Sequence, residues 1–269
     1  MRLGRRLPGF LVALMVISNV FVMAGCNRNE IGSEKSKDVN GNNVVQTDKP
    51  VSNNDTKDKL LEGVKVLKHS SLRFAGDKTI YFDPFKLEGE PHDADIIFIT
   101  HTHYDHFSTE DIKKLAKEDT TIVITSDGAD LLDKDVFKKQ VSVEPGKEYE
   151  IDGLKVRTVP AYNVDKDYHP KSENWVGYIL NINNLDYYIA GDTDYTPEMK
   201  EIKADVAFLP VGGTYTTDAK EAAQAANVIK PKIAVPIHYG EIIGDDTNAE
   251  SFIKLLDEGI KGVILKAKE

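Results

Sequence analysis

The amino-acid sequence predicts an α+β domain in which two β-sheets are covered on their outer faces by helices. Segments typical of strands alternate with segments typical of helices near both ends of the region that starts at residue 60. Between them lies a strand-rich section with two turn dipeptides, Asp152-Gly153 and Asn183-Asn184, which are typical of antiparallel pairing. Two packed sheets with outer helices account for both patterns within one domain over residues 60–269.

The first half of this domain is expected to alternate strands with short helices. The run at 96–99 is Ile-Ile-Phe-Ile, which is typical of a strand buried on both faces. Ser108, three residues before Asp111, predicts the N-cap of a helix that reaches residues 112–117. A second short helix is expected over 128–132. The strands expected in this half are 64–67, 79–82, 96–99 and 121–125.

The second half is expected to begin with antiparallel strands and then to return to alternation. The antiparallel strands are expected at 148–151, 154–160, 176–182 and 186–190. The alternating elements that follow are a strand at 206–209, a helix at 219–229, a strand at 233–237, a helix at 248–256 and a strand at 262–265. Asp218 followed by Glu221 predicts a capping box at the start of the first of these helices.

Residues 1–25 are expected to be a signal peptide, and Cys26 a lipidation site. Arginines precede an apolar run at residues 10–24, which suits a signal-peptide core and is short for a membrane span. The run ends in Val-Met-Ala-Gly-Cys, which resembles the lipobox of bacterial lipoproteins and holds the one cysteine of the chain. The alternative is an ordinary secretory leader with a chance cysteine. A lipidated protein would be extracytoplasmic and anchored to the bacterial cell membrane through its lipid alone.

Residues 26–59 are expected to be a disordered tether that follows the lipidated cysteine. Asn, Asp, Lys and Ser dominate this segment, and it contains no aromatic residue after the leader. Such a segment buries too little apolar surface to offset the entropy lost on ordering. The tether would hold the folded domain away from the membrane surface.

Composition limits both the partners and the chemistry. The chain has 34 Lys+Arg against 44 Asp+Glu, for a formal net charge of −10. An acidic protein gains no advantage from counterion release on nucleic acid, so no nucleic-acid partner is expected. The expected partner is a small-molecule substrate. A single cysteine excludes an internal disulfide framework and a Cys-rich zinc site. Any bound metal must therefore be held by histidine and carboxylate.

A histidine-rich motif follows the predicted buried strand that ends near residue 100. Its sequence is His-Thr-His-Tyr-Asp-His, with candidate ligands His101, His103, Asp105 and His106. Residues two apart in an extended chain point the same way, so His101, His103 and Asp105 are expected to share one face. Neutral imidazoles and carboxylates are good ligands for zinc and related cations. The motif predicts a metal site, and the alternative is a polar loop with coincidental histidines.

The motif H-x-H-x-D-H after a buried strand resembles the hallmark of the metallo-β-lactamase fold superfamily. Over residues 64–269 the chain looks like the branch of metal-dependent hydrolases near the ascorbate-6-phosphate lactonases. The resemblance implies a four-layer αββα sandwich and one or two zinc or manganese ions. It also implies that His101 and His103 bind one metal, and that Asp105 and His106 bind a second.

Two later residues match the superfamily pattern, and one position departs from it. Asp192 follows a predicted strand, as does the carboxylate that bridges the metals in the family. His238 follows the strand at 233–237, as does the family's last ligand of the second metal. Asn163, in Pro-Ala-Tyr-Asn, stands where many relatives carry a third histidine for the first metal. Its amide oxygen is a harder ligand, which shifts metal preference toward manganese, and we expect Asn163 to face the metals.

Three further residues are candidates around the metals. Asp83 resembles the family aspartate that orients the ligand loop through hydrogen bonds, and the alternative is a turn aspartate before proline. His69, near an early strand, either faces the pocket or is a structural histidine. His169, in a charged loop, is a candidate metal or substrate contact. The loop at 210–218 either binds an anionic part of the substrate or is a tight turn.

The expected reaction is hydrolysis of an ester, lactone, amide or phosphodiester bond by metal-activated water. Asp192 and Asp105 are the expected catalytic residues: Asp192 holds the attacking water and accepts its proton, and Asp105 holds the second metal. The alternative from another class is a surface-tethered metal- or ligand-binding protein without turnover, with Asn163 marking the loss of activity.

Overall fold

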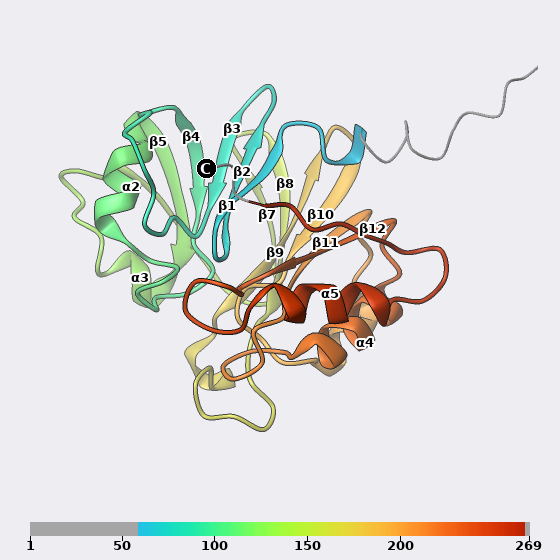
Figure 1. Cartoon of the computed structure of the whole chain (residues 1–269). Coiled ribbons are helices and arrows are strands. Elements are labelled where there is room, and N and C mark those ends of the chain that lie inside the picture. The colour runs from blue at the N-terminus through green and yellow to red at the C-terminus, as the bar shows by residue number, and fades with distance from the viewer. Residues whose placement is uncertain (1–58, 267–269) are drawn as a thin grey trace, which may run out of the picture. The chain divides into compact units, whose positions relative to one another are not determined.

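In the computed structural model, two β-sheets organise residues 59–266, the part of the chain that the structure describes (Figure 1). The predicted signal peptide, Cys26 and all of the predicted tether except residue 59 lie outside these residues. Within 59–266, the helices are too short or too polar to cross a membrane.

The N-terminal sheet changes from antiparallel to parallel pairing along its width. Its first three strands pair antiparallel, and from the third strand onward every pair is parallel. The strands lie side by side in chain order: β1 (Val64–Lys68), β2 (Ser71–Ala75), β3 (Thr79–Phe82), β4 (Ala94–Phe98), β5 (Ala116–Thr125) and β6 (Lys139–Val143).

The C-terminal sheet changes in the same order, from antiparallel to parallel pairing. Two hairpins begin it, and their turns lie at Asp152-Gly153 and Asn183-Asn184, as predicted. All four turn residues have positive φ, which Asp, Asn and Gly tolerate better than other residues. The strands, again in chain order, are β7 (Glu148–Ile151), β8 (Leu154–Pro160), β9 (Val176–Ile182), β10 (Leu185–Ile189), β11 (Val206–Pro210), β12 (Ile233–Ile237) and β13 (Lys261–Gly262).

The two sheets pack face to face around an aromatic and aliphatic core. Tyr178 of β9 packs against Phe82 and Phe98 of the N-terminal sheet, with ring centroids 6.2 and 5.0 Å away. Phe74 of β2 and Phe208 of β11 meet at 5.9 Å. These rings are buried, and each contributes about 1.5–3 kcal/mol of transfer free energy. The inner layers of the domain are therefore the two sheets.

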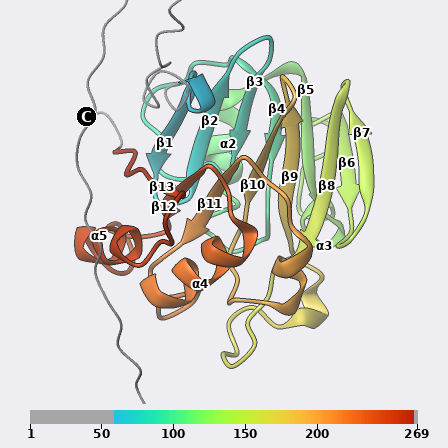
Figure 2. The ribbon, with the colours of Figure 1, turned by 90° about the vertical axis from the view of Figure 1, so that its right-hand side faces the viewer.

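Helices cover the outer face of each sheet (Figures 1 and 2). α2 (Thr109–Leu115) and α3 (Ser126–Ala129) lie on the N-terminal sheet, and α4 (Ala219–Ile229) and α5 (Asp246–Lys254) lie on the C-terminal sheet. Separate apolar clusters fill the space beneath each helical layer. Two short 3-10 helices complete the elements, at Lys171–Glu173 and Pro197–Glu201. The predicted α+β class and four-layer αββα sandwich are confirmed.

The caps expected from the sequence are present. The Ser108 side chain accepts a hydrogen bond from the Asp111 backbone N–H, and Asp218 and Glu221 form a reciprocal capping box at α4. A second capping box at Asp245 starts α5 two residues before the predicted boundary. These caps fix the first turns of helices that directly follow loops carrying or flanking candidate residues.

Two strands were not predicted, and several boundaries differ. β2 has a charged residue at its centre, and β6 is an edge strand of mixed polarity, so neither shows a clear apolar pattern. α3 covers 126–129 instead of 128–132, and β13 covers 261–262 instead of 262–265. The unpredicted β2 matters for function because the turn between β1 and β2 carries His69.

The strand order brings the candidate residues to one edge of the sandwich. The histidine motif follows β4, Asn163 follows β8, Asp192 follows β10 and His238 follows β12. Gly191 allows the β10 end to approach the motif, because a Cβ there would lie 3.0 Å from the Thr100 Cβ, and its φ is +66°. Residues from both sheets therefore converge, although the motif and His238 are more than a hundred positions apart in the chain.

Candidate metal centre

The loop that carries the histidine motif turns sharply after His103. The backbone N–H groups of His106 and Phe107 both donate to the His103 carbonyl, at 3.0 and 2.8 Å. The turn directs Asp105 away from His101 and toward a different group of side chains. The expectation that His101, His103 and Asp105 share one face assumed an extended chain and is wrong at Asp105.

His101, His103 and His169 form one group of ligand-type side chains, the first set. His103 Nδ1 lies 3.1 Å from both His101 Nε2 and His169 Nε2. His101 and His169 are buried, and His103 is half-buried. Two of these residues come from the motif loop, and His169 comes from the loop between β8 and β9.

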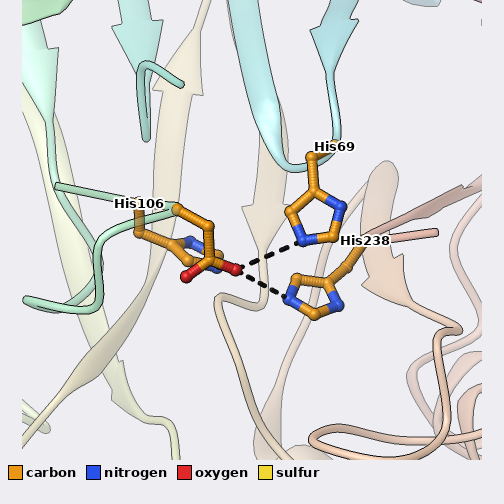
Figure 3. Close-up of side chains that lie close together, drawn as sticks. His69, His106 and His238 are labelled. Atoms are coloured by element: carbon orange, nitrogen blue, oxygen red, sulfur yellow. Dashed lines mark ion pairs between the residues drawn. The ribbon is translucent and has the colours of Figure 1, made fainter. Parts of the chain in front are cut away.

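His69, Asp105, His106 and His238 form a second group, the second set. One ligand-type atom from each lies within 4.8 Å of the others. Asp105 Oδ2 is at the centre of the group, 3.3 Å from His69 Nε2, 3.6 Å from His238 Nε2 and 3.7 Å from His106 Nε2. Figure 3 shows the three histidines directed toward one carboxylate, with dashed lines for the pairs that involve His69 and His238.

Asp192 lies between the two sets and reaches both. Its Oδ2 is 3.0 Å from His238 Nε2 and 3.3 Å from His169 Nε2, and its Oδ1 is 3.2 Å from His106 Nε2. His101 Nε2 is farther away, at 3.9 Å. A single buried carboxylate thus faces histidines of both sets.

The spacing and the unpaired atoms of these side chains fit bound cations. Four ligands arranged tetrahedrally at about 2.0–2.2 Å from a zinc ion lie about 3.4 Å apart, close to the separations seen here. Several buried ligand-type atoms have no hydrogen-bond partner among the described residues: His69 Nδ1 and Nε2, His106 Nε2, His238 Nδ1 and Nε2, and Asp192 Oδ1. Such atoms are rare in proteins unless something binds them. The group is a buried His/Asp metal-binding cluster.

The electrostatics favour the ligand form of His101 and of the two carboxylates, whereas at His106 and His238 burial would lower the pKa of the imidazole, but the neighbouring Asp192 outweighs this effect and raises it. Burial lowers the pKa of the His101 imidazole well below its ordinary value, and the neighbouring His106 lowers it further. Burial would raise the pKa of the Asp192 carboxyl, but His106 and His238 outweigh this effect and hold the pKa well below its ordinary value. Asp105 likewise has a lowered pKa, because its contacts with His238 and His69 outweigh burial. Neutral imidazole and ionised carboxylate are the ligand forms.

Asp83 holds the motif loop from behind the metal-facing atoms. Its carboxylate accepts hydrogen bonds from the Thr100 backbone N–H, the Thr100 hydroxyl and His106 Nδ1, each at 2.8 Å. The bond to Nδ1 fixes the proton there and leaves His106 Nε2 with a lone pair toward the cluster. The structure thus places Asp83 where the sequence predicts an orienting aspartate.

Asn163 lies beside His169 and contacts it through its amide oxygen. Its Oδ1 lies 2.9 Å from the His169 backbone N and 3.0 Å from His169 Nδ1. Its Nδ2 donates to Asp194 Oδ1 at 3.1 Å and to the Tyr215 carbonyl at 2.9 Å. Both ends of the amide are therefore used in holding the loop that carries His169.

Trp175 is a site residue that the sequence analysis missed. Its indole packs against all three histidines of the first set, with ring centroids 4.9 Å from His101, 4.7 Å from His103 and 5.6 Å from His169. Its Nε1 donates to Asp127 Oδ2 at 3.0 Å. It is the one tryptophan of the chain, and this was the sequence feature that could have drawn attention to it. Lys166, which pairs with Asp194 beside Asn163, was also missed.

Comparisons with known proteins agree with the fold and the cluster. The family described as a beta-lactamase superfamily domain matches residues 63–238. A UPF0173 metal-dependent hydrolase from Thermococcus onnurineus is 34% identical over 223 residues, which cover 77% of this chain and 97% of the relative. One from Pyrococcus abyssi is also 34% identical, over 224 residues and the same shares of the two chains.

Solved structures extend the likeness to three dimensions. A protein of Parabacteroides distasonis named as a metal-dependent hydrolase has a TM-score of 0.64 at 34% identity, covering 76% of this chain and 93% of that one. Igni18, a metallo hydrolase of Ignicoccus hospitalis, has a TM-score of 0.64 at 24% identity, covering 77% and 95%, and shares the fold.

An αββα sandwich with a buried His/Asp cluster at its strand ends defines a metal-dependent hydrolase of the metallo-β-lactamase superfamily. Within that superfamily, the chain belongs to the UPF0173 metal-dependent hydrolase family.

Proposed function

We propose that the protein hydrolyses an ester, lactone, amide or phosphodiester bond in a small molecule at a centre that holds two cations. The observation that carries this proposal is the position of Asp192, whose two carboxylate oxygens lie within 3.3 Å of histidines from both sets. A carboxylate shared between two ligand groups is the arrangement that a two-metal hydrolytic site needs. The lactonase-like resemblance of the sequence makes lactones the first substrates to test.

The cluster residues would hold cations, and one of them would also act on water. When bound, divalent cations lower the pKa of a coordinated water and polarise a carbonyl or phosphoryl oxygen. Asp192 is placed to orient the attacking water and to accept its proton, because Oδ1 has no hydrogen-bond partner among residues 59–266. Asp105 holds the second set together through its contacts with three histidines. The residues that would hold cations are His101, His103, His169, Asp192, Asp105, His106 and His238.

A substrate panel with matched variants tests the proposal. The purified protein is assayed on generic lactones, esters, amides and phosphodiesters with added zinc or manganese. Asp192→Asn should lower kcat by about 100-fold or more, since it removes the acceptor for the proton. Asp77→Asn, at an exposed position in the β2–β3 turn, should leave kcat unchanged. Bound metal without turnover on the whole panel would favour the alternative of a binding protein.

We further propose that zinc is the preferred cation over manganese. His169 supplies a third imidazole to the first set, where the sequence analysis expected the harder oxygen of Asn163. Sets rich in imidazole nitrogen favour zinc, whereas oxygen-rich sets favour manganese. Equilibrium dialysis of metal-free protein against equal zinc and manganese should leave mainly zinc bound. A manganese excess in the dialysed protein would contradict this preference.

The location of the protein is a separate proposal that rests on the leader sequence alone. We propose that Cys26 is lipidated and anchors the protein on the outer side of the bacterial cell membrane. Incorporation of labelled fatty acid should be lost in Cys26→Ser, and the protein should leave the membrane fraction. Ser36→Ala in the tether is the control and should keep both the label and the location. Equal labelling of Cys26→Ser would exclude this anchor.

A further inference from the structure

His69 occupies an unusual position for a large polar side chain. It lies in the turn between β1 and β2 with φ +54°, in the left-handed region that L-residues seldom adopt. Its side chain is 0% exposed. Its carbonyl accepts a hydrogen bond from the His238 backbone N–H at 3.2 Å, which ties the turn to the end of β12. The fold therefore fixes His69 against His238.

The imidazole of His69 is buried without the hydrogen bonds that would compensate for lost hydration. Neither ring nitrogen has a hydrogen-bond partner among the residues that the structure describes. A merely structural histidine would normally find a partner for at least one nitrogen.

The His69 ring lies within the cluster of ligand-type side chains. Nε2 lies 3.3 Å from Asp105 Oδ2 but without hydrogen-bond geometry, and the ring centroid lies 3.9 Å from that of His238 (Figure 3). Ligand-type atoms of His69, Asp105, His106 and His238 all lie within 4.8 Å of one another. Atoms that share a cation show such spacing without hydrogen bonds between them.

We propose that His69 is a fourth protein ligand of the second set, which then holds its cation with three imidazoles and one carboxylate before Asp192 is counted. This inference rests on the proposed two-cation centre. The ligand pattern to which the sequence was compared supplies only Asp105, His106, His238 and the bridging carboxylate to this site. With His69, the second set has four protein ligands of its own and Asp192 as a fifth, while the first set has three imidazoles and Asp192. Sites in which protein side chains fill all the coordination positions are typical of tightly held cations.

Metal content tests the proposal directly. Metal-free protein is prepared by chelation, loaded with zinc, desalted and analysed for zinc per chain. The wild type should retain two zinc ions and His69→Ala one, with the affinity for the lost ion reduced by about 100-fold or more. His92→Ala, which changes a histidine with a half-exposed side chain in the loop before β4, should retain two. Two tightly held ions in His69→Ala would overturn the proposal.

Trp175 reports which ion is lost, because its indole contacts the three rings of the first set. Zinc binding to His69→Ala should still change the Trp175 emission, since the first set remains. His169→Ala should show the complementary result: one zinc ion bound with little change in emission. If zinc no longer changed the Trp175 emission of His69→Ala, His69 would belong to the first set instead of the second. This result would also overturn the proposal.

Unfolding experiments separate a ligand from a structural residue. In excess chelator, His69→Asn should unfold at about the same denaturant concentration as the wild type, because Asn tolerates the left-handed backbone and no compensated hydrogen bond is removed. With zinc, the wild type should be stabilised more than His69→Asn. Equal stabilisation of both proteins by zinc would contradict the ligand role. If the wild type bound two zinc ions but hydrolysed no substrate, the proposed hydrolysis would be contradicted. The assignment of His69 as a ligand would not be affected.

Discussion

The Asn163 amide oxygen and His169 Nδ1 lie 3.0 Å apart, and this contact fixes the tautomer of His169. The orientation of the amide is itself fixed, because Nδ2 faces the Tyr215 carbonyl and Oδ1 faces the His169 backbone N–H. An amide oxygen only accepts, so Nδ1 carries the proton and Nε2 keeps a lone pair. That lone pair points to the first set, 3.1 Å from His103 Nδ1.

Removing the Asn163 amide should therefore weaken the first set. We expect Asn163→Ala to lower zinc affinity at that set by about 10- to 100-fold, the usual effect of losing a group that orients a ligand. Zinc competition with a chelator of known affinity, followed through Trp175 emission, measures the change. Asn181→Ala, which removes a different amide contact in β9 with Asp186, is the control and should bind zinc normally. Unchanged affinity in Asn163→Ala would mean that His169 needs no such support.

Asp83 should have the same influence on the second set through His106. In Asp83→Asn the amide cannot accept from both Thr100 and His106 with the strength of a carboxylate, so His106 loses its fixed tautomer. The expected result is zinc release from the second set that is about 10-fold faster or more. Asp95→Asn, which alters a carboxylate bound to the Thr79 N–H at the other end of the same sheet, should release zinc at the wild-type rate. Equal release rates in the two variants would refute the role of Asp83.

Trp175 should contribute to stability as well as to the shape of the first set. Trp175→Ala removes a buried indole that packs on three imidazoles, and should cost about 3–5 kcal/mol in the free energy of unfolding. Trp175→Phe keeps most of the packing and loses the hydrogen bond to Asp127, so about 1–2 kcal/mol is expected. Urea unfolding in excess chelator, followed by circular dichroism, measures both. A larger loss in the Phe variant would assign the stabilisation to the hydrogen bond instead.

Asp111 gives the fold an acid-sensitive contact outside the metal cluster. Its carboxylate accepts from the backbone N–H groups of Lys86 and Leu87 and from the Lys114 ammonium, at 2.8, 3.0 and 2.9 Å. Burial would raise the pKa of Asp111, but these bonds and the one to Ser108 outweigh it and lower the pKa below the ordinary 3.8. A lowered folded-state pKa means stability that is present above pH 3.8 and is lost as pH falls through the folded-state value.

The corresponding prediction compares Asp111→Asn with the wild type across pH. In excess chelator, the variant should be less stable at pH 7, and the difference should shrink as pH falls below about 4. Asp77→Asn, which changes a carboxylate at an exposed position, is the control variant. A gap for Asp111→Asn that stays constant down to pH 2.5 would show that ionisation of Asp111 contributes nothing.

The sequence predicted the parts of the site that depend on local pattern. Asp192 and His238 were assigned from the family resemblance, because each follows a predicted strand in the expected order, and the parallel strands that precede them in the C-terminal sheet end at one edge. Asp83 was assigned from the same resemblance. The α+β class with two sheets under outer helices followed from the order of strands and helices, the four-layer αββα sandwich followed from the resemblance, and both are confirmed.

The roles of Asn163, His169 and His69 depend on contacts between distant segments. His169 reaches the first set because Asn163 and the Tyr215 carbonyl, about fifty residues further on, hold its loop. His69 reaches the second set because an unpredicted strand, β2, turns the chain back and gives the residue a left-handed backbone. No local pattern encodes either contact, so the sequence left both histidines as open candidates.

The most direct test of the two-set centre is anomalous diffraction at the zinc edge from crystals of the zinc-loaded protein. The account predicts two peaks in the cluster, one among His101, His103 and His169 and one among Asp105, His106 and His238, with Asp192 between them. A single peak, or peaks only at exposed side chains, would contradict it.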